Sequence, residues 1–176
     1  MSALRLVRQD TISAGVQQID VTDVFTSDFD VYKIVASGIK AAANTRIDAN
    51  FIDSSGSVVT GDYNNAALEI KGDTSYNEQK NNLSYIKNVG YSGANGDGGF
   101  VMHIFNPYDS TLNTHFISES YGGFTGDSST HDNVTYRGSG VLKENSSITG
   151  LRIDMDSQNT AGTLGRVAIY GYRMEA

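Results

Sequence analysis

The sequence predicts an all-β fold in which antiparallel strands pack in two layers around one core. Glycine occurs 19 times and proline once, and Ser, Thr, Asn and Asp are abundant between short apolar segments. Those residues form turns, whereas Val, Ile, Tyr, Phe and Thr fill strands. Apolar and polar residues also alternate with period two in several segments. Many short strands joined by polar turns indicate a sandwich or a barrel.

The expected strands follow from this alternation, which is clearest from Arg46 to Phe51 and from Leu151 to Asp156. In both segments one side of the strand should face a core and the other side water. Tyr63 to Ile70 also suits a helix, but its apolar residues fit a strand as well. Polar turns or loops are expected at 53–56, 90–99 and 122–132. In chain order the expected strands are Leu4 to Arg8, Val16 to Val21, Val31 to Ala36, Ile47 to Phe51, Val58 to Thr60, Ala66 to Lys71, Leu83 to Lys87, Phe100 to Phe105, Thr114 to Glu119, Val134 to Val141, Leu151 to Met155 and Val167 to Tyr172.

The length of 176 residues fits one domain, so we expect residues 1–176 to form a single sandwich. Residues 1–15 are a candidate docking arm or an edge strand. A chain of this size buries roughly 70% of its unfolded surface and needs no disulfide or structural metal. The absence of cysteine excludes a thiolate nucleophile, a Cys-based zinc site and a disulfide framework.

The charge balance argues against two classes of partner. Thirteen basic and twenty acidic residues give 13 − 20 = −7, and Lys and Arg do not cluster. Nucleic-acid binding depends largely on phosphate neutralisation, so we expect no DNA or RNA partner. An anionic membrane surface is disfavoured for the same reason. The longest apolar run, Val167 to Tyr170, is far too short to span a bilayer, and we expect a soluble chain without a signal peptide.

No sequence motif indicates catalysis. The patterns GxxxxGK[ST], HExxH and GxSxG are absent. Three histidines, His103, His115 and His131, are enough in number for a zinc site, but we interpret the first two as strand residues and the third as a loop residue. We therefore expect no catalytic residues, no cofactor and no enzymatic activity.

Asp154 and Asp156 form the densest acidic pattern and should lie on one side of a strand. Their carboxylates are a weak Ca²⁺ candidate, provided that loop carbonyls complete the oxygen ligands. The preferred interpretation is a solvated strand face that discourages edge pairing.

Ten tyrosines and seven phenylalanines, without tryptophan, raise the alternative of a sugar-binding face. Tyr91, Tyr121 and Phe124 lie in or beside the expected loops and are the candidate platform. A glycan-degrading enzyme, a further alternative, would need two carboxylates about 5–10 Å apart in a cleft. The sequence neither locates nor excludes such a pair.

Four segments, in this order, resemble a family of β-sandwich modules found in tailed-bacteriophage virion proteins. That family includes head decoration proteins and tail-fibre modules. The resemblance implies a jelly-roll-like antiparallel sandwich whose last two strands, Leu151 to Met155 and Val167 to Tyr172, form an antiparallel pair. It spans roughly residues 16–173 and rests on strand and turn patterns, without a catalytic motif. The segments are Asp28 to Ile39, Arg46 to Val59, Phe105 to Ser120 and Ser147 to Arg173.

The resemblance implies a noncatalytic virion structural protein, and we expect a capsid decoration (cement) protein on the capsid exterior. Its partners would be the major capsid protein or other virion proteins, and it would form a homotrimer. Such a protein stabilises a shell by binding its assembled state. The alternative is a tail-fibre or receptor-binding carbohydrate-recognition module. The candidate docking residues are Leu4, Arg5, Leu6, Val7 and Arg8, which could add to a neighbour's sheet.

Overall fold

The computed structural model describes residues 4–71, 76–93, 96–124, 133–156, 160 and 165–173, without the side chains of 71, 76–81, 123 and 124. Within these residues every regular element is a strand, and all strand pairs are antiparallel. The predicted all-β, jelly-roll-like sandwich is therefore confirmed. None of these residues belongs to a helix that could cross a membrane.

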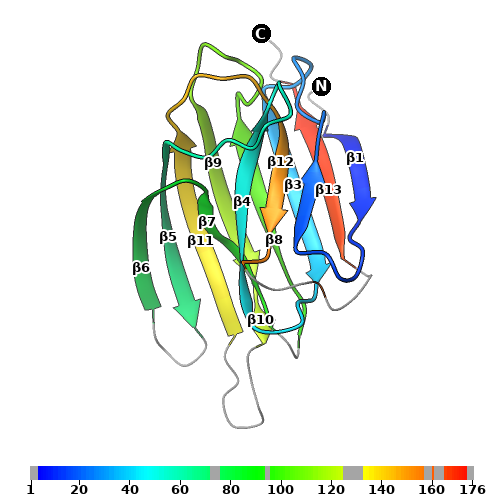
Figure 1. The fold of residues 1–176 in the computed structure, drawn as a ribbon, viewed down its shortest axis with the longest axis vertical. Helices are drawn as coiled ribbons and strands as arrows, with labels where there is room; N and C mark the ends of the chain where they lie inside the picture. Colours follow the sequence, from blue (N-terminus) through cyan, green and yellow to red (C-terminus); the bar gives the residue numbers. More distant parts are fainter. Residues whose placement is uncertain are drawn as a thin grey trace.

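The strands form two layers, and the smaller sheet lies over the middle of the larger one (Figure 1). The larger sheet has nine strands and the smaller has four. Along the larger sheet the order is β1 (Arg5–Thr11), β13 (Arg166–Tyr172), β3 (Val31–Ile39), β8 (Gly98–Phe105), β9 (Thr114–Tyr121), β11 (Asn133–Leu142), β5 (Tyr63–Lys71) and β6 (Tyr76–Leu83), with β10 (Gly123–Phe124) beside β11. The smaller sheet runs β2 (Gln18–Val21), β12 (Ile148–Asp154), β4 (Thr45–Asp53) and β7 (Ile86–Ser92).

The core lies between the two sheets and is filled by the inward residues of each alternating strand. β9 shows the cause most plainly, because its side chains are alternately buried and exposed from Thr114 to Tyr121. At the centre, the ring of Phe51 on β4 contacts Tyr63 on β5 and Phe116 on β9, at centroid distances of 5.9 and 6.2 Å. These aromatic contacts across the layers fix the two sheets against each other.

The closing strands differ from the resemblance. β12 and β13 do not pair with each other, because β12 lies between β2 and β4 while β13 lies between β1 and β3. Both strands face the core, as their apolar patterns indicate. Such a pattern defines which face of a strand is buried, whereas the neighbouring strand is chosen by the path of the chain, which here changes sheets.

The structure also confirms or corrects the expectations for individual segments. Tyr63–Lys71 is a strand, not a helix. The expected strand Leu83 to Lys87 is wrong, because the chain bends at Ser84 and Tyr85 between β6 and β7. Val58 forms only an isolated bridge, with Ile52. At the turn that starts at Asp53, the carboxylate accepts hydrogen bonds from the backbone of Ser55 and Ser57, which explains the sharp reversal.

Candidate functional site

The outer face of the nine-stranded sheet carries rows of outward side chains that the strand register places side by side. The first row crosses six strands and consists of Ala168, Val35, Val101, Glu119, Arg137 and Leu68. The next row is Tyr170, Lys33, His103, Ile117, Ser139 and Ala66. A third row is Tyr172, Val31, Phe105, His115, Val141 and Asn64. We call these three rows the outer face.

Apolar and aromatic side chains make up most of the outer face. Ile117, at its middle, is 48% exposed, and Leu68 near one end is 36% exposed. Large exposed apolar patches on folded proteins usually mark interaction sites, whereas single exposed apolar residues are ordinary. The outer face is therefore mainly apolar in composition.

A depression of about 330 Å³ lies on the outer face over β8, β9 and β11. Val101 and Ile117 contribute apolar walls, and Glu119 and Arg137 are joined there by an ion pair of 2.6 Å. His103 lines the same depression, and partial burial together with the charge of Lys33 lowers the pKa of its imidazole. His103 is therefore mainly neutral at pH 7, and Arg137 and Glu119 largely cancel each other's charge.

The outer face of the four-stranded sheet is polar instead. Arg152 donates two hydrogen bonds to the carboxylate of Asp20, both at 2.7 Å. Gln18 donates to Asp154 at 2.7 Å, and Arg46 donates to Asp156 at 3.1 Å. Exposed ion pairs of this kind add little stability, but they keep a surface compatible with water. The sandwich thus has one mainly polar face and one mainly apolar face.

An acidic pocket interrupts the polar face. Its volume is about 300 Å³, and its lining residues are Gln17, Asp48, Asn50, Tyr85, Asp154 and Asp156. Asp48 and Asp154 lie directly opposite each other on β4 and β12. Asn50 uses its amide N–H groups to donate to the carbonyls of Val59 and Ser84, which leaves oxygen acceptors to dominate the pocket.

Asp48 has an unusual environment in this pocket. Only 7% of the residue is exposed, and its carboxylate accepts the backbone N–H of Asn88 at 2.7 Å. Burial raises the pKa of Asp48 to about 6, and the nearby Asp156 acts in the same direction, against the opposing effects of that hydrogen bond and of Arg46. Burial and the Asp48 carboxylate also raise the pKa of Tyr85. A carboxyl that titrates near neutrality can exchange a proton under physiological conditions.

The expected Ca²⁺ candidates have internal partners. Asp154 accepts from Gln18, and Asp156 binds Arg46 at 3.1 Å. In the part of the chain that the structure describes, no three His, Cys, Asp or Glu residues are arranged to hold a metal ion. Of the histidines, His103 faces Ile117 and His115 faces Phe105 in the ladder, while His131 lies outside the described residues.

The three aromatic residues expected to form a sugar platform belong to three different strands. Tyr91, on β7, packs against Tyr136 at a centroid distance of 6.5 Å. Tyr121 continues the outward set of β9, and its hydroxyl accepts the N–H of Gly38 at 3.1 Å. Phe124 belongs to β10, and its side chain lies outside the described residues.

Four of the five candidate docking residues, from Arg5 to Arg8, lie in β1, which pairs with β13 inside the chain's own sheet, and Leu4 directly precedes it. Leu4 and Leu6 are 46% and 51% exposed, and Val7 is also exposed. Arg8 is held internally, because it contacts Asp10 at 2.7 Å and donates to the carbonyl of Thr22 at 3.2 Å. The segment is thus an edge strand, and its apolar residues remain available to a partner.

No family model and no curated protein sequence matches this chain. Among solved structures, it is similar to an endo-β-1,4-glucuronan lyase from the fungus Trichoderma reesei, with 8% identity over 97% of this chain and 85% of the lyase and a TM-score of 0.29. A family 7 alginate lyase in complex with substrate gives 9% identity over 84% of this chain and 63% of the lyase, with a TM-score of 0.25. The VP2 subviral particle of infectious bursal disease virus gives 7% identity over 96% of this chain and 42% of that chain, with a TM-score of 0.11. Similarity at this level assigns neither a family nor an activity.

Proposed function

We propose that this protein is a noncatalytic structural component of a tailed-phage virion, and specifically a capsid decoration protein. In this proposal the outer face of the nine-stranded sheet binds across neighbouring capsid subunits on the exterior of the shell. The observation that supports it most is the contrast between the two faces of the sandwich. A partner that covers the apolar face and leaves the polar face to solvent stabilises the assembled shell by mass action.

The rigidity of the sandwich supports the same role. The core runs without interruption between the two sheets, and its aromatic residues interlock across the layers. A stiff surface loses little conformational entropy on binding, so more of the contact energy remains as affinity. Repeated contacts over a symmetric shell would then add through avidity.

The experiment is binding of purified protein to capsids that lack it, followed by imaging of the particle. Ile117→Lys places a charge at the middle of the outer face and should weaken binding by at least tenfold without unfolding the chain. Leu112→Lys is the matched control, because Leu112 is 46% exposed, close to the 48% of Ile117, but lies in the loop between β8 and β9. Equal binding of both variants would reject the outer face, and a tail position in the particle would reject the decoration role.

A second candidate, glycan recognition, is favoured by the acidic pocket. Its carboxylate and amide oxygens would accept hydrogen bonds from sugar hydroxyls, and Tyr85 supplies an aromatic ring. The test is a glycan array with wild type and with Tyr85→Ala. Binding that the variant loses would favour this function, whereas an array without hits, together with capsid binding, would favour decoration. Cleavage of a bound glycan that is lost in Asp48→Asn would instead indicate an enzyme.

A further inference from the structure

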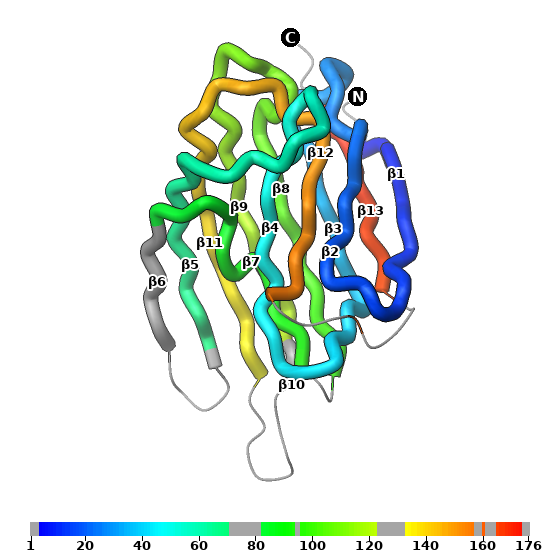
Figure 2. The backbone as a smooth tube through the Cα atoms, viewed as in Figure 1, coloured from blue at the N-terminus to red at the C-terminus, as the bar shows by residue number. Residues whose placement is uncertain are grey.

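β1 leaves one edge of the nine-stranded sheet open. Among the residues that the structure describes, it is the last strand on its side of the sheet and pairs only with β13. β2 is the corresponding edge of the smaller sheet, and Figure 2 shows both along the same rim of the sandwich. An open edge with exposed apolar side chains, here Leu6 and Val7, is a template for another strand.

The hydrogen bonds to β13 determine which groups of β1 point outward. Ile12 donates its N–H to the carbonyl of Gly165 at 2.7 Å, just beyond the last paired residues of the ladder. Because bonded and non-bonded pairs alternate in an antiparallel ladder, positions 165, 167 and 169 of β13 bond to β1 and positions 166, 168 and 170 do not. Gln9 faces Ala168 and Leu6 faces Tyr170, so the N–H and C=O groups of Gln9 and Leu6 point to the open edge.

A bulge sets the spacing of these outward groups. The register shifts between Leu6 and Arg8, so Val7 is an extra residue in the strand. Leu6 and Gln9 are therefore three residues apart, whereas outward groups of a regular strand are two apart. A regular strand pairs with β1 on both sides of the bulge only through a shift in register, as β13 does. A second copy of β1 matches the three-residue spacing when it runs antiparallel, because its own Gln9 and Leu6 have the same spacing.

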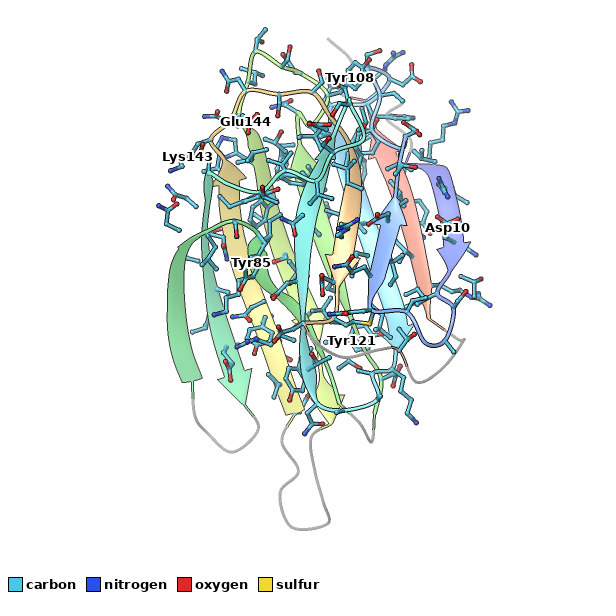
Figure 3. All side chains as sticks on the ribbon, in the orientation of Figure 1. Asp10, Tyr85, Tyr108, Tyr121, Lys143 and Glu144 are labelled. Carbon is cyan, nitrogen blue, oxygen red and sulfur yellow. The ribbon has the colours of Figure 1, made fainter. Side chains whose placement is uncertain are left out.

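The charged residues of β1 favour the same antiparallel register between the two copies. When Leu6 faces Gln9 of the second copy, Arg5 faces Asp10 of that copy and Asp10 faces its Arg5. Both residues lie opposite odd-numbered positions of β13, Gly171 and Val167, and so share one face of the sheet. Figure 3 places Asp10 on β1 at the rim. Opposite charges at directly paired positions stabilise strand pairing.

We propose that β1 pairs with β1 of a second copy about a two-fold axis between Val7 and Arg8, which joins two nine-stranded sheets into one. The occupant of this edge is thus another copy of the chain. The contact closes on two copies, whereas the resemblance to virion modules implies three. The contact uses the edge and not the outer face, so its test is independent of the proposed function.

The first test compares the mass in solution of wild type and Gln9→Pro by analytical ultracentrifugation. Proline at position 9 removes an N–H that points to the open edge and leaves the bonds to β13 in place. We expect wild type to have twice the mass of the chain and Gln9→Pro to dissociate at least tenfold more readily, with an unchanged unfolding midpoint at concentrations where both are monomeric. A wild type that is monomeric at about 100 µM, a trimer, or a dimer that Gln9→Pro leaves intact would overturn the proposal.

The second test covers the case in which Gln9→Pro fails to fold. The chain has no cysteine, so the double variant Leu6→Cys with Gln9→Cys can form disulfides only between these positions. Directly opposed residues have Cα atoms about 5.5 Å apart, which suits a disulfide. We expect the double variant to cross-link as a dimer on oxidation and Leu6→Cys alone not to, because the two copies of position 6 are about 10 Å apart. Cross-linking by the single variant, or none by the double variant, would overturn the register.

Discussion

Asn88 donates its backbone N–H to the buried carboxylate of Asp48 at 2.7 Å, and among the described residues this is the only hydrogen bond that the side chain of Asp48 receives. One hydrogen bond does not offset the burial of a charge, which explains why the pKa of Asp48 rises from 3.8 to about 6. Arg46, the cation with the largest effect on Asp48, is already paired with Asp156. The buried charge of Asp48 therefore lowers the stability of the folded state at neutral pH.

Asp48→Asn should raise the free energy of unfolding at pH 7 to 8. The folded pKa of Asp48 exceeds its unfolded value, so the native state binds more protons between about pH 4 and 6 and stability falls as pH rises through that window. Two pKa units correspond to up to about 3 kcal/mol at neutral pH. Asparagine keeps an oxygen that can accept the N–H of Asn88 and carries no charge. Urea unfolding at several pH values between 4 and 8 measures the difference.

The control for this prediction is Asp20→Asn on the same face of the sandwich. Asp20 is exposed and bonded to Arg152, so its loss should cost less than about 1 kcal/mol at neutral pH. If Asp48→Asn lowers stability at pH 7 or leaves the slope between pH 4 and 6 unchanged, the carboxyl is not held in a destabilising environment.

Alternation in the sequence was enough to place residues on the correct faces. The segment from Arg46 to Asn50 shows that Asp48 lies on the outward side of β4. It does not show that Asp48 is buried, because the residues that create the pocket come from other parts of the chain. Tyr85 reaches it from the bend between β6 and β7, where a continuous strand was expected. Burial of an outward residue depends on tertiary contacts that a local pattern does not contain.

The sequence likewise predicts only part of the outer face. Each strand shows its own outward residues, such as Ile117 on β9 and Val101 on β8. That these residues form one surface depends on strand order, because β3 comes from a distant part of the chain to lie beside β8. The misassigned pairing of β12 with β13 has the same origin. A period-two pattern predicts faces, whereas neighbours follow from the path of the connections.

Tyr63→Phe should destabilise the fold although it preserves the ring. The hydroxyl of Tyr63 accepts the N–H of Phe51 at 2.9 Å and donates to the carbonyl of Val59 at 3.2 Å. Its removal leaves a buried N–H without a partner, which costs about 1–3 kcal/mol. Urea unfolding measures the loss, and faster hydrogen exchange at the amide of Phe51 would locate it. The exposed Tyr108→Phe should change stability by less than about 0.5 kcal/mol. Equal effects of the two variants would contradict this account.

Calcium should leave the melting temperature unchanged. Asp154 and Asp156 each contact a donor of the same chain, Gln18 and Arg46, and a cation would have to displace these partners. An ion that binds only the folded state raises the melting temperature. Differential scanning calorimetry in chelator and in about 5 mM calcium, which exceeds the dissociation constants of weak protein sites, is therefore a direct test. A higher melting temperature in calcium that is lost in Asp154→Asn would show that these carboxylates bind the ion.

Gly140→Ala should be far more destabilising than Gly138→Ala in the same strand. A methyl group at position 140 would overlap the carbonyl oxygen of Asn64 and approach the ring of Phe116 to 2.5 Å, so β5 or the aromatic core must shift. At position 138 the nearest atoms are the Ala66 carbonyl at 3.0 Å and the Ser118 hydroxyl at 3.3 Å, which small movements relieve. Overpacking of a core typically costs about 1–3 kcal/mol, whereas alanine is otherwise preferred to glycine in a strand. Urea unfolding of the two variants compares them directly, and equal midpoints would mean that β5 and β11 are not packed as closely as the structure has them.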